Sequence, residues 1–74
     1  MHNVYVLKKG RDSRWYIGQT SDLNKRLDMH KKLHPGYKLA YYECYNSGKQ
    51  AVERERKLKY YGSAWRALRK RIHA

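Results

Sequence analysis

The sequence predicts an α+β domain in which a three-stranded antiparallel sheet is flanked by helices. Three short segments rich in β-branched and aromatic residues, at 3–8, 14–19 and 37–45, are typical of strands. Amphipathic segments follow the second and third of them, at about 22–33 and 48–61, and are typical of helices that cover a sheet.

The first two strands are expected to form a β-hairpin. Residues 3–8 read Asn-Val-Tyr-Val-Leu-Lys and residues 14–19 read Arg-Trp-Tyr-Ile-Gly-Gln, with the turn residues Gly-Arg-Asp-Ser at 10–13 between them. Two short strands separated by such a turn are typical of a hairpin.

The next segment is expected to be a helix that Thr20 or Ser21 caps, with Asp22 in its first turn. Its inward stripe is expected to consist of Leu23, Leu27 and either His30 or Lys31, and His-Pro-Gly at 34–36 ends it.

The third strand, 37–45, carries aromatic residues on alternate positions and is expected to be partly buried on both faces. Ser47 and Gln50 can form a capping box for the following helix, which runs to about Tyr61. The segment Gly62-Ser63 breaks this helix, and a terminal helix is expected over Ala64–Ile72. Its inward side chains are expected to be Trp65 and Leu68.

The chain is strongly basic. It has 18 Lys and Arg against 6 Asp and Glu, a formal net charge of +12, whereas a charge of about 2 to 8 suffices to keep a small domain soluble. Such an excess attracts polyanions. Nucleic acid is favoured over an anionic membrane, because no segment is long and apolar enough to span a bilayer.

The composition indicates a single folded domain, 1–74, with a thin core, because a chain of this size buries only about 60% of its surface on folding. Cys44 is the only cysteine, which excludes an intramolecular disulfide and a cysteine-built zinc site. It is expected to act as a small apolar group inside a strand. With residues 1–3 leading directly into a strand, we expect no secretory signal and a cytoplasmic location.

Among the acidic residues, Glu55 is the strongest candidate for a catalytic or metal-binding role. At about 100° per residue, its side chain falls in the middle of the apolar stripe that runs from Leu58 to Val52, whereas Glu53 points outward. An inward carboxylate needs a cation. That cation is either Arg26 or another base, in an internal ion pair, or a bound Mg²⁺ or Mn²⁺ ion, which takes oxygen ligands.

Asp22, Arg26 and His30 recur every four residues and share one helical stripe. Asp22 and Arg26 can simply form an ion pair, but a guanidinium is also the best side chain for gripping a phosphate. His30, taken alone, is expected at the surface or lightly packed. Tyr5 and Tyr16 lie on neighbouring strands, where such side chains usually serve core and rim packing.

The remaining bases on the last two helices form a predicted phosphate-binding surface of low sequence selectivity. They are Lys49, Arg54, Arg56, Lys57, Lys59, Arg66, Arg69, Lys70 and Arg71.

Several motifs together resemble the GIY-YIG nuclease family, and most closely its small stand-alone branch, which is like the N-terminal nuclease domain of an excinuclease. Segment 4–6 (Val-Tyr-Val) keeps the tyrosine of the first motif, and 16–18 (Tyr-Ile-Gly) is the complete second motif. Residues 16–30 continue as Tyr-Ile-Gly-x-Thr-x-Asp-Leu-x-x-Arg-Leu-x-x-His, followed by Tyr-Tyr-Glu at 41–43 and Ala-x-x-x-Glu-x-x-x-Lys at 51–59.

The resemblance implies a metal-dependent DNA endonuclease with Tyr5, Tyr16, Arg26, His30 and Glu55 at its site. Glu55 would bind one Mg²⁺ or Mn²⁺ ion, Arg26 would stabilise charge at the scissile phosphate, and one of the tyrosines would activate or position water. His30 would assist proton transfer or contact phosphate.

Larger relatives carry an asparagine after the glutamate helix and a separate DNA-binding domain. No asparagine follows Ser47 here, and we expect a protein partner to supply target selectivity. The alternative is a non-catalytic basic module that binds DNA or RNA and keeps the nuclease fold.

Overall fold

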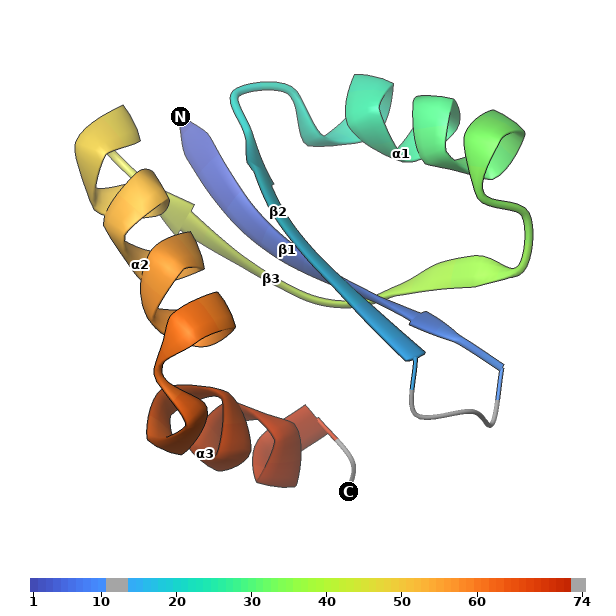
Figure 1. The fold of residues 1–74 in the computed structure, drawn as a ribbon. Coiled ribbons are helices and arrows are strands. Elements are labelled where there is room, and N and C mark those ends of the chain that lie inside the picture. The colour runs from blue at the N-terminus through green and yellow to red at the C-terminus, as the bar shows by residue number, and fades with distance from the viewer. Residues whose placement is uncertain (11–13, 73–74) are drawn as a thin grey trace.

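The computed structural model describes residues 1–10 and 14–72. Its elements are, in order, β1 (His2–Lys9), β2 (Arg14–Thr20), α1 (Leu23–Leu33), β3 (Tyr37–Tyr45), α2 (Gly48–Tyr60) and α3 (Gly62–Ile72). The strands form one antiparallel sheet in the order β2-β1-β3 (Figure 1). The predicted α+β class and its three-stranded sheet are confirmed. Of the predicted turn, residues 11–13 lie outside the described part of the chain.

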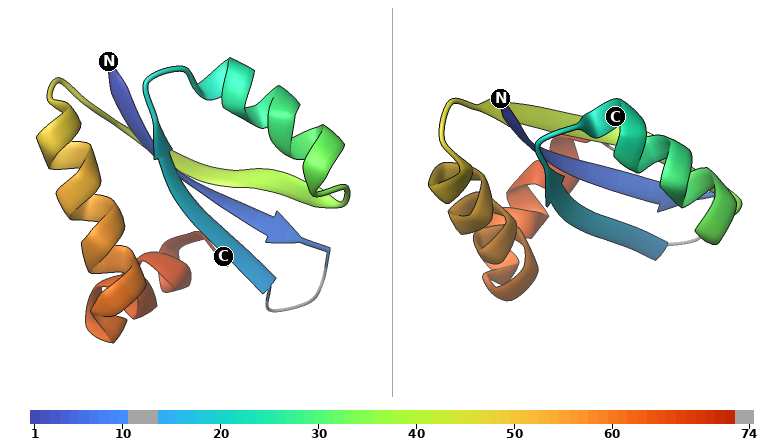
Figure 2. Two further views of the ribbon diagram at one scale, coloured as in Figure 1. Left: turned by 45° about the horizontal axis from the view of Figure 1, so that its top comes forward. Right: turned by 90° about the horizontal axis from the view of Figure 1, so that it is seen from above.

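Helices lie on both sides of the sheet, with α1 apart from α2 and α3 (Figure 2). Because side chains alternate along a strand, β1 contributes to two different packing layers. On one side, the buried cluster consists of Val4, Val6, Ala51, Leu58 and Leu68, joined by the partly buried Trp65. On the other side, Tyr5 and Leu7 face α1. The predicted inward positions of Trp65 and Leu68 are therefore confirmed.

The helix boundaries differ from the prediction at two places. Asp22 is itself the N-cap of α1, because its side chain accepts a hydrogen bond from the Lys25 backbone N–H at 3.0 Å, so it does not lie in the first turn. Helix α3 begins at Gly62 instead of Ala64, directly after Tyr61 ends α2. Ser47 caps α2 as expected, accepting hydrogen bonds from two backbone N–H groups.

An irregularity in the β1–β3 pairing decides which side chains of β3 reach the core. Val6 pairs with Tyr41 but Leu7 pairs with Leu39, so Ala40 is an extra residue that reverses the alternation. Beyond it, Tyr42 and Cys44 are exposed. The expected burial of both faces of β3 is wrong here, as is the interior position of Cys44, whose thiol donates to Asn3 Oδ1 at 2.9 Å.

Glu43 fastens β3 to α2. Its Oε1 accepts hydrogen bonds from the Tyr45 hydroxyl at 2.7 Å and from Arg54 Nε at 3.0 Å. Its Oε2 accepts from the Tyr41 hydroxyl at 2.6 Å and from the other arm of the Arg54 guanidinium at 3.2 Å. Burial alone would raise the pKa of Glu43, but these hydrogen bonds outweigh burial and hold the pKa below its ordinary value of 4.5.

Replacing this carboxylate tests its contribution to stability. We expect Glu43→Gln to lower the free energy of unfolding by about 1–3 kcal/mol near neutral pH, because the Arg54 guanidinium and both phenols lose a charged acceptor. A depressed pKa in the folded state means that the wild-type contribution is complete above about pH 4.5 and is lost as the pH falls through the folded value. Urea unfolding at neutral and acid pH measures both effects.

The matched control is Glu53→Gln, which removes the same charge from an exposed position on α2. Equal destabilisation by the two substitutions would contradict the role given to Glu43.

Candidate active site

Tyr5 lies at the centre of the site and in the interior of the protein, with 1% of its surface exposed. Its Cα is paired with that of Gly18 on the neighbouring strand β2. A Cβ atom at residue 18 would come within 2.5 Å of the Tyr5 hydroxyl oxygen. The phenol therefore lies over the face of β2, in space that any side chain at residue 18 would fill.

His30 of α1 is the hydrogen-bond partner of this phenol. The Tyr5 hydroxyl lies 2.9 Å from His30 Nε2, and only 5% of His30 is exposed. Burial, together with the charges of His34 and Arg26, lowers the pKa of His30 below its ordinary value of 6.5. The expectation that His30 lies at the surface or is lightly packed is wrong, and His30 instead of Lys31 continues the inward stripe of the helix. Both partners of this hydrogen bond are therefore buried.

Tyr16 forms the exposed rim of the same cluster. It pairs with Leu7 and not with Tyr5, so the two tyrosines are diagonal neighbours whose ring centroids are 6.2 Å apart. Its ring also lies 4.8 Å from that of His30. With 39% of its surface exposed, Tyr16 is open to solvent, which gives the two phenols distinct environments.

Two opposite charges act on the Tyr5 hydroxyl. Burial and the neighbouring Tyr16 raise the pKa of Tyr5 to about 12, with Arg26 lowering it and Glu55 raising it. A phenol with this pKa is protonated at neutral pH. Arg26 of α1 and Glu55 of α2 thus act on this pKa in opposite directions.

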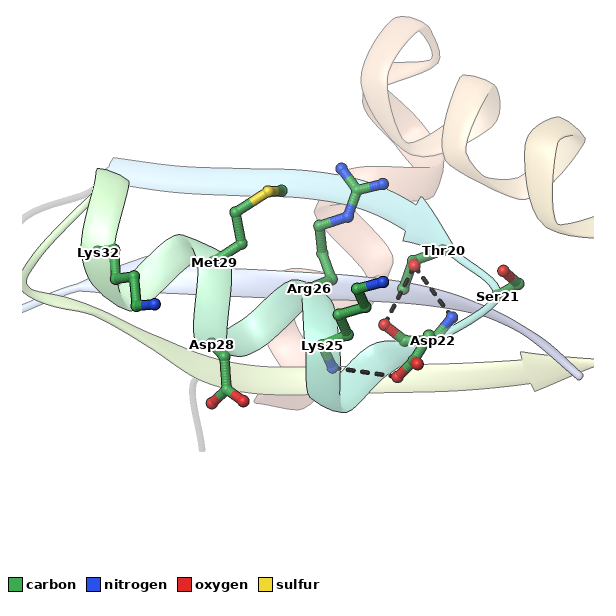
Figure 3. A pocket seen from close by; sticks show the side chains of 8 residues that line it. All are labelled: Thr20, Ser21, Asp22, Lys25, Arg26, Asp28, Met29 and Lys32. Atoms are coloured by element: carbon green, nitrogen blue, oxygen red, sulfur yellow. Dashed lines mark hydrogen bonds between the residues drawn. The ribbon is translucent and has the colours of Figure 1, made fainter.

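Arg26 belongs to an open pocket beside α1, on the side of the helix turned toward β2 (Figure 3). Within residues 1–10 and 14–72 no ion pair joins it to Asp22, whose carboxylate instead caps the helix. The pocket also contains the cations of Lys25 and Lys32. The simple Asp22–Arg26 pair considered from the sequence is therefore absent, and the Arg26 guanidinium is available to an anion.

Glu55 is half-buried on α2, with 24% of its side chain exposed, and its Oε1 lies 3.2 Å from Lys59 Nζ. Glu55 thus pairs with a base other than Arg26, but this ion pair lies at the surface and is not internal, because the Lys59 side chain is 42% exposed. Among the described residues no group of three or more His, Cys, Asp and Glu could hold a metal ion. A single carboxylate still fits Mg²⁺, which keeps several waters and takes further oxygens from a substrate phosphate.

Most of the predicted phosphate-binding bases are exposed, but Arg54 is not available. Its guanidinium is paired with Glu43 and its side chain is only 27% exposed, so the prediction that it binds nucleic acid loses its basis. Arg69 is half-buried. Exposed bases are Lys49, Arg56, Lys57, Lys59, Arg66, Lys70 and Arg71.

The sequence reasoning missed two rings of this cluster. The His34 ring lies 5.5 Å from that of His30 and 6.2 Å from that of Tyr16, and Tyr37 packs against it at 6.2 Å. The available signal was spacing, because His34 follows His30 by four residues and extends the stripe that starts at Arg26.

One of three comparisons with known proteins gives a match. Residues 1–60 match the model of the GIY-YIG catalytic domain. Neither the curated proteins nor the solved structures give a significant match. The matched range contains all of the sheet, α1 and α2, and therefore Tyr5, Tyr16, Arg26, His30 and Glu55. The chain belongs to the GIY-YIG family, whose catalytic domain implies a nuclease-type function.

Proposed function

We propose that this protein is a DNA endonuclease that hydrolyses phosphodiester bonds with the help of one divalent ion. One observation supports this above all: a buried Tyr5 hydroxyl is hydrogen-bonded to His30 and lies under the influence of both Arg26 and Glu55. Hydrolysis of a phosphodiester needs a proton acceptor, a cation at the phosphate and a way to stabilise the leaving oxygen. These four residues supply groups of the required kinds.

Tyr5 and His30 together accept the proton of the attacking water. Because the pKa of Tyr5 is raised to about 12, its hydroxyl does not ionise in advance. It takes a proton from water while passing its own proton to His30 Nε2, which lies 2.9 Å away. The lowered pKa of His30 keeps the imidazole neutral before this transfer and ready to accept.

Arg26, and the ion that Glu55 would hold, stabilise negative charge at the phosphate and the leaving oxygen. The Arg26 guanidinium binds two phosphate oxygens and stabilises the negative charge that grows on them during attack. Glu55 would hold the Mg²⁺ or Mn²⁺ ion, and when bound this ion would stabilise the phosphate and the leaving oxygen. Lys59 then loses its carboxylate partner, so its ammonium becomes free to contact the DNA backbone.

DNA is the proposed substrate because the formal net charge is +12 and the exposed bases of α2 and α3 can contact phosphates without reading bases. We propose that target selectivity comes from a protein partner.

The rival function, a basic module that binds nucleic acid without cleaving it, is favoured by one observation. Glu55 already has a cation partner in Lys59, and the described residues contain no group of three or more His, Cys, Asp and Glu that could hold a metal ion. Tight and salt-sensitive DNA binding without strand cleavage, in the presence of Mg²⁺ or Mn²⁺, would select this rival.

The first test is Glu55→Gln, measured as nicking of supercoiled plasmid with Mg²⁺ or Mn²⁺. Removing a ligand charge should lower the rate by about 10²-fold or more, and excess metal should not restore it. Glu53→Gln, an exposed position on the same helix, should keep wild-type activity. Nicking that survives Glu55→Gln at the wild-type rate would remove both the metal proposal and the assignment of the activity to this protein.

The second test concerns pH. Since His30 must be neutral to accept a proton and its pKa is lowered, the single-turnover rate should be constant near neutrality and fall with a midpoint below pH 6.5. His30→Gln keeps a hydrogen-bond acceptor but cannot take the proton, so it should lower the rate by about 10²- to 10⁴-fold and abolish this acid limb. A variant that retains the wild-type acid limb would show that another group titrates.

A further inference from the structure

A groove lies next to the proposed catalytic residues, along the outer edge of β2. Three consecutive residues of this strand line it, although neighbouring side chains of a strand point to opposite faces. Such lining places the groove at the strand edge, where no other strand pairs with β2 in the described sheet. The lining residues are Trp15, Tyr16, Ile17, Leu58, Lys59 and Trp65.

The groove is aromatic and carries positive charge at its mouth. The Trp15 and Trp65 rings meet edge to face at 5.2 Å, and the buried Leu58 belongs to the lining. Lys59, whose side chain is 42% exposed, adds a positive charge. The groove volume of about 470 Å³ is in the range of about 300–1,000 Å³ found for small-molecule sites.

The groove is continuous with the site. Tyr16, which lines it, packs against His30 and Tyr5 on its other side. Lys59, which also lines it, holds Glu55 through the 3.2 Å ion pair. A nucleotide strand whose phosphate lies at Arg26 and Glu55 therefore has an aromatic recess within reach of its next base.

We propose that this groove receives an unpaired base adjacent to the scissile phosphate, so that the enzyme acts on single-stranded or locally unpaired DNA. The proposal rests on the proposed nuclease function. Bases stack on aromatic side chains with little sequence preference because every base has a π-face. A base inside a duplex is stacked and paired, and entering an edge groove would require it to leave the helix, at a cost of a few kcal/mol.

The test measures binding without cleavage. Native protein in EDTA is titrated with a short thymidine oligonucleotide, with an oligomer of equal length whose sugars lack bases, and with a blunt duplex, at one fixed salt concentration. Both tryptophans of the chain line the groove, so their fluorescence reports its occupancy. We expect quenching by the thymidine oligonucleotide and about tenfold weaker binding of the abasic oligomer, whereas the duplex should bind without quenching.

Two substitutions localise the effect. Lys59→Ala removes a charge from the groove, and Lys57→Ala removes one from an exposed position of α2 outside its lining. Lys59→Ala should weaken thymidine binding several-fold more than Lys57→Ala. Trp65→Leu should remove the preference for the thymidine over the abasic oligomer, in protein whose thermal unfolding is still cooperative.

Equal affinity and equal quenching for the thymidine and abasic oligomers would overturn the proposal, as would quenching by the duplex at the same concentration. These results are independent of turnover. Cleavage without base-dependent quenching would reject the groove alone, and base-dependent quenching without cleavage in Mg²⁺ would reject the nuclease proposal and leave a single-strand binding site.

Discussion

The site depends on one steric constraint, the passage of the Tyr5 phenol across β2 at the position where residue 18 has no side chain. Tyr5 projects from the central strand toward α1, and its neighbour on β2, Gly18, has no side chain on that face. The phenol therefore lies over β2, and its hydroxyl reaches His30 of α1. A Cβ at residue 18 would come within 2.5 Å of the hydroxyl oxygen, so any larger residue would push the phenol off its partner.

Glu43 and Glu55 are both half-buried carboxylates, but their side-chain partners differ, and this difference decides which of them can bind a ligand. Glu43 accepts four hydrogen bonds from three side chains and has no capacity left for a ligand. Glu55 has one flexible ammonium as its ion-pair partner, and a surface pair of this kind is worth about 1 kcal/mol or less. The first carboxylate holds β3 and α2 together, so that the second is presented on a helix whose position is fixed.

Most elements of the fold and the five candidate site residues could be predicted from the sequence, because the patterns that indicate them are local. Strand alternation and cap residues located the elements to within a few residues, and the family motifs selected the five site residues. Three features could not be predicted. The extra residue Ala40 inverts the second half of β3 and exposes Cys44, which no alternation rule indicates. Arg54 and His30 depend on partners distant in sequence, Glu43 and Tyr5, so their burial and pairing required the fold.

The distribution of the cluster over four elements has a consequence for the nascent chain. During synthesis the residues through β3 emerge first, and they carry both phenols, the guanidinium and the imidazole, but lack Glu55. Because the carboxylate arrives only with α2, the set of five residues is complete only after α2 has been synthesised and has packed against the sheet.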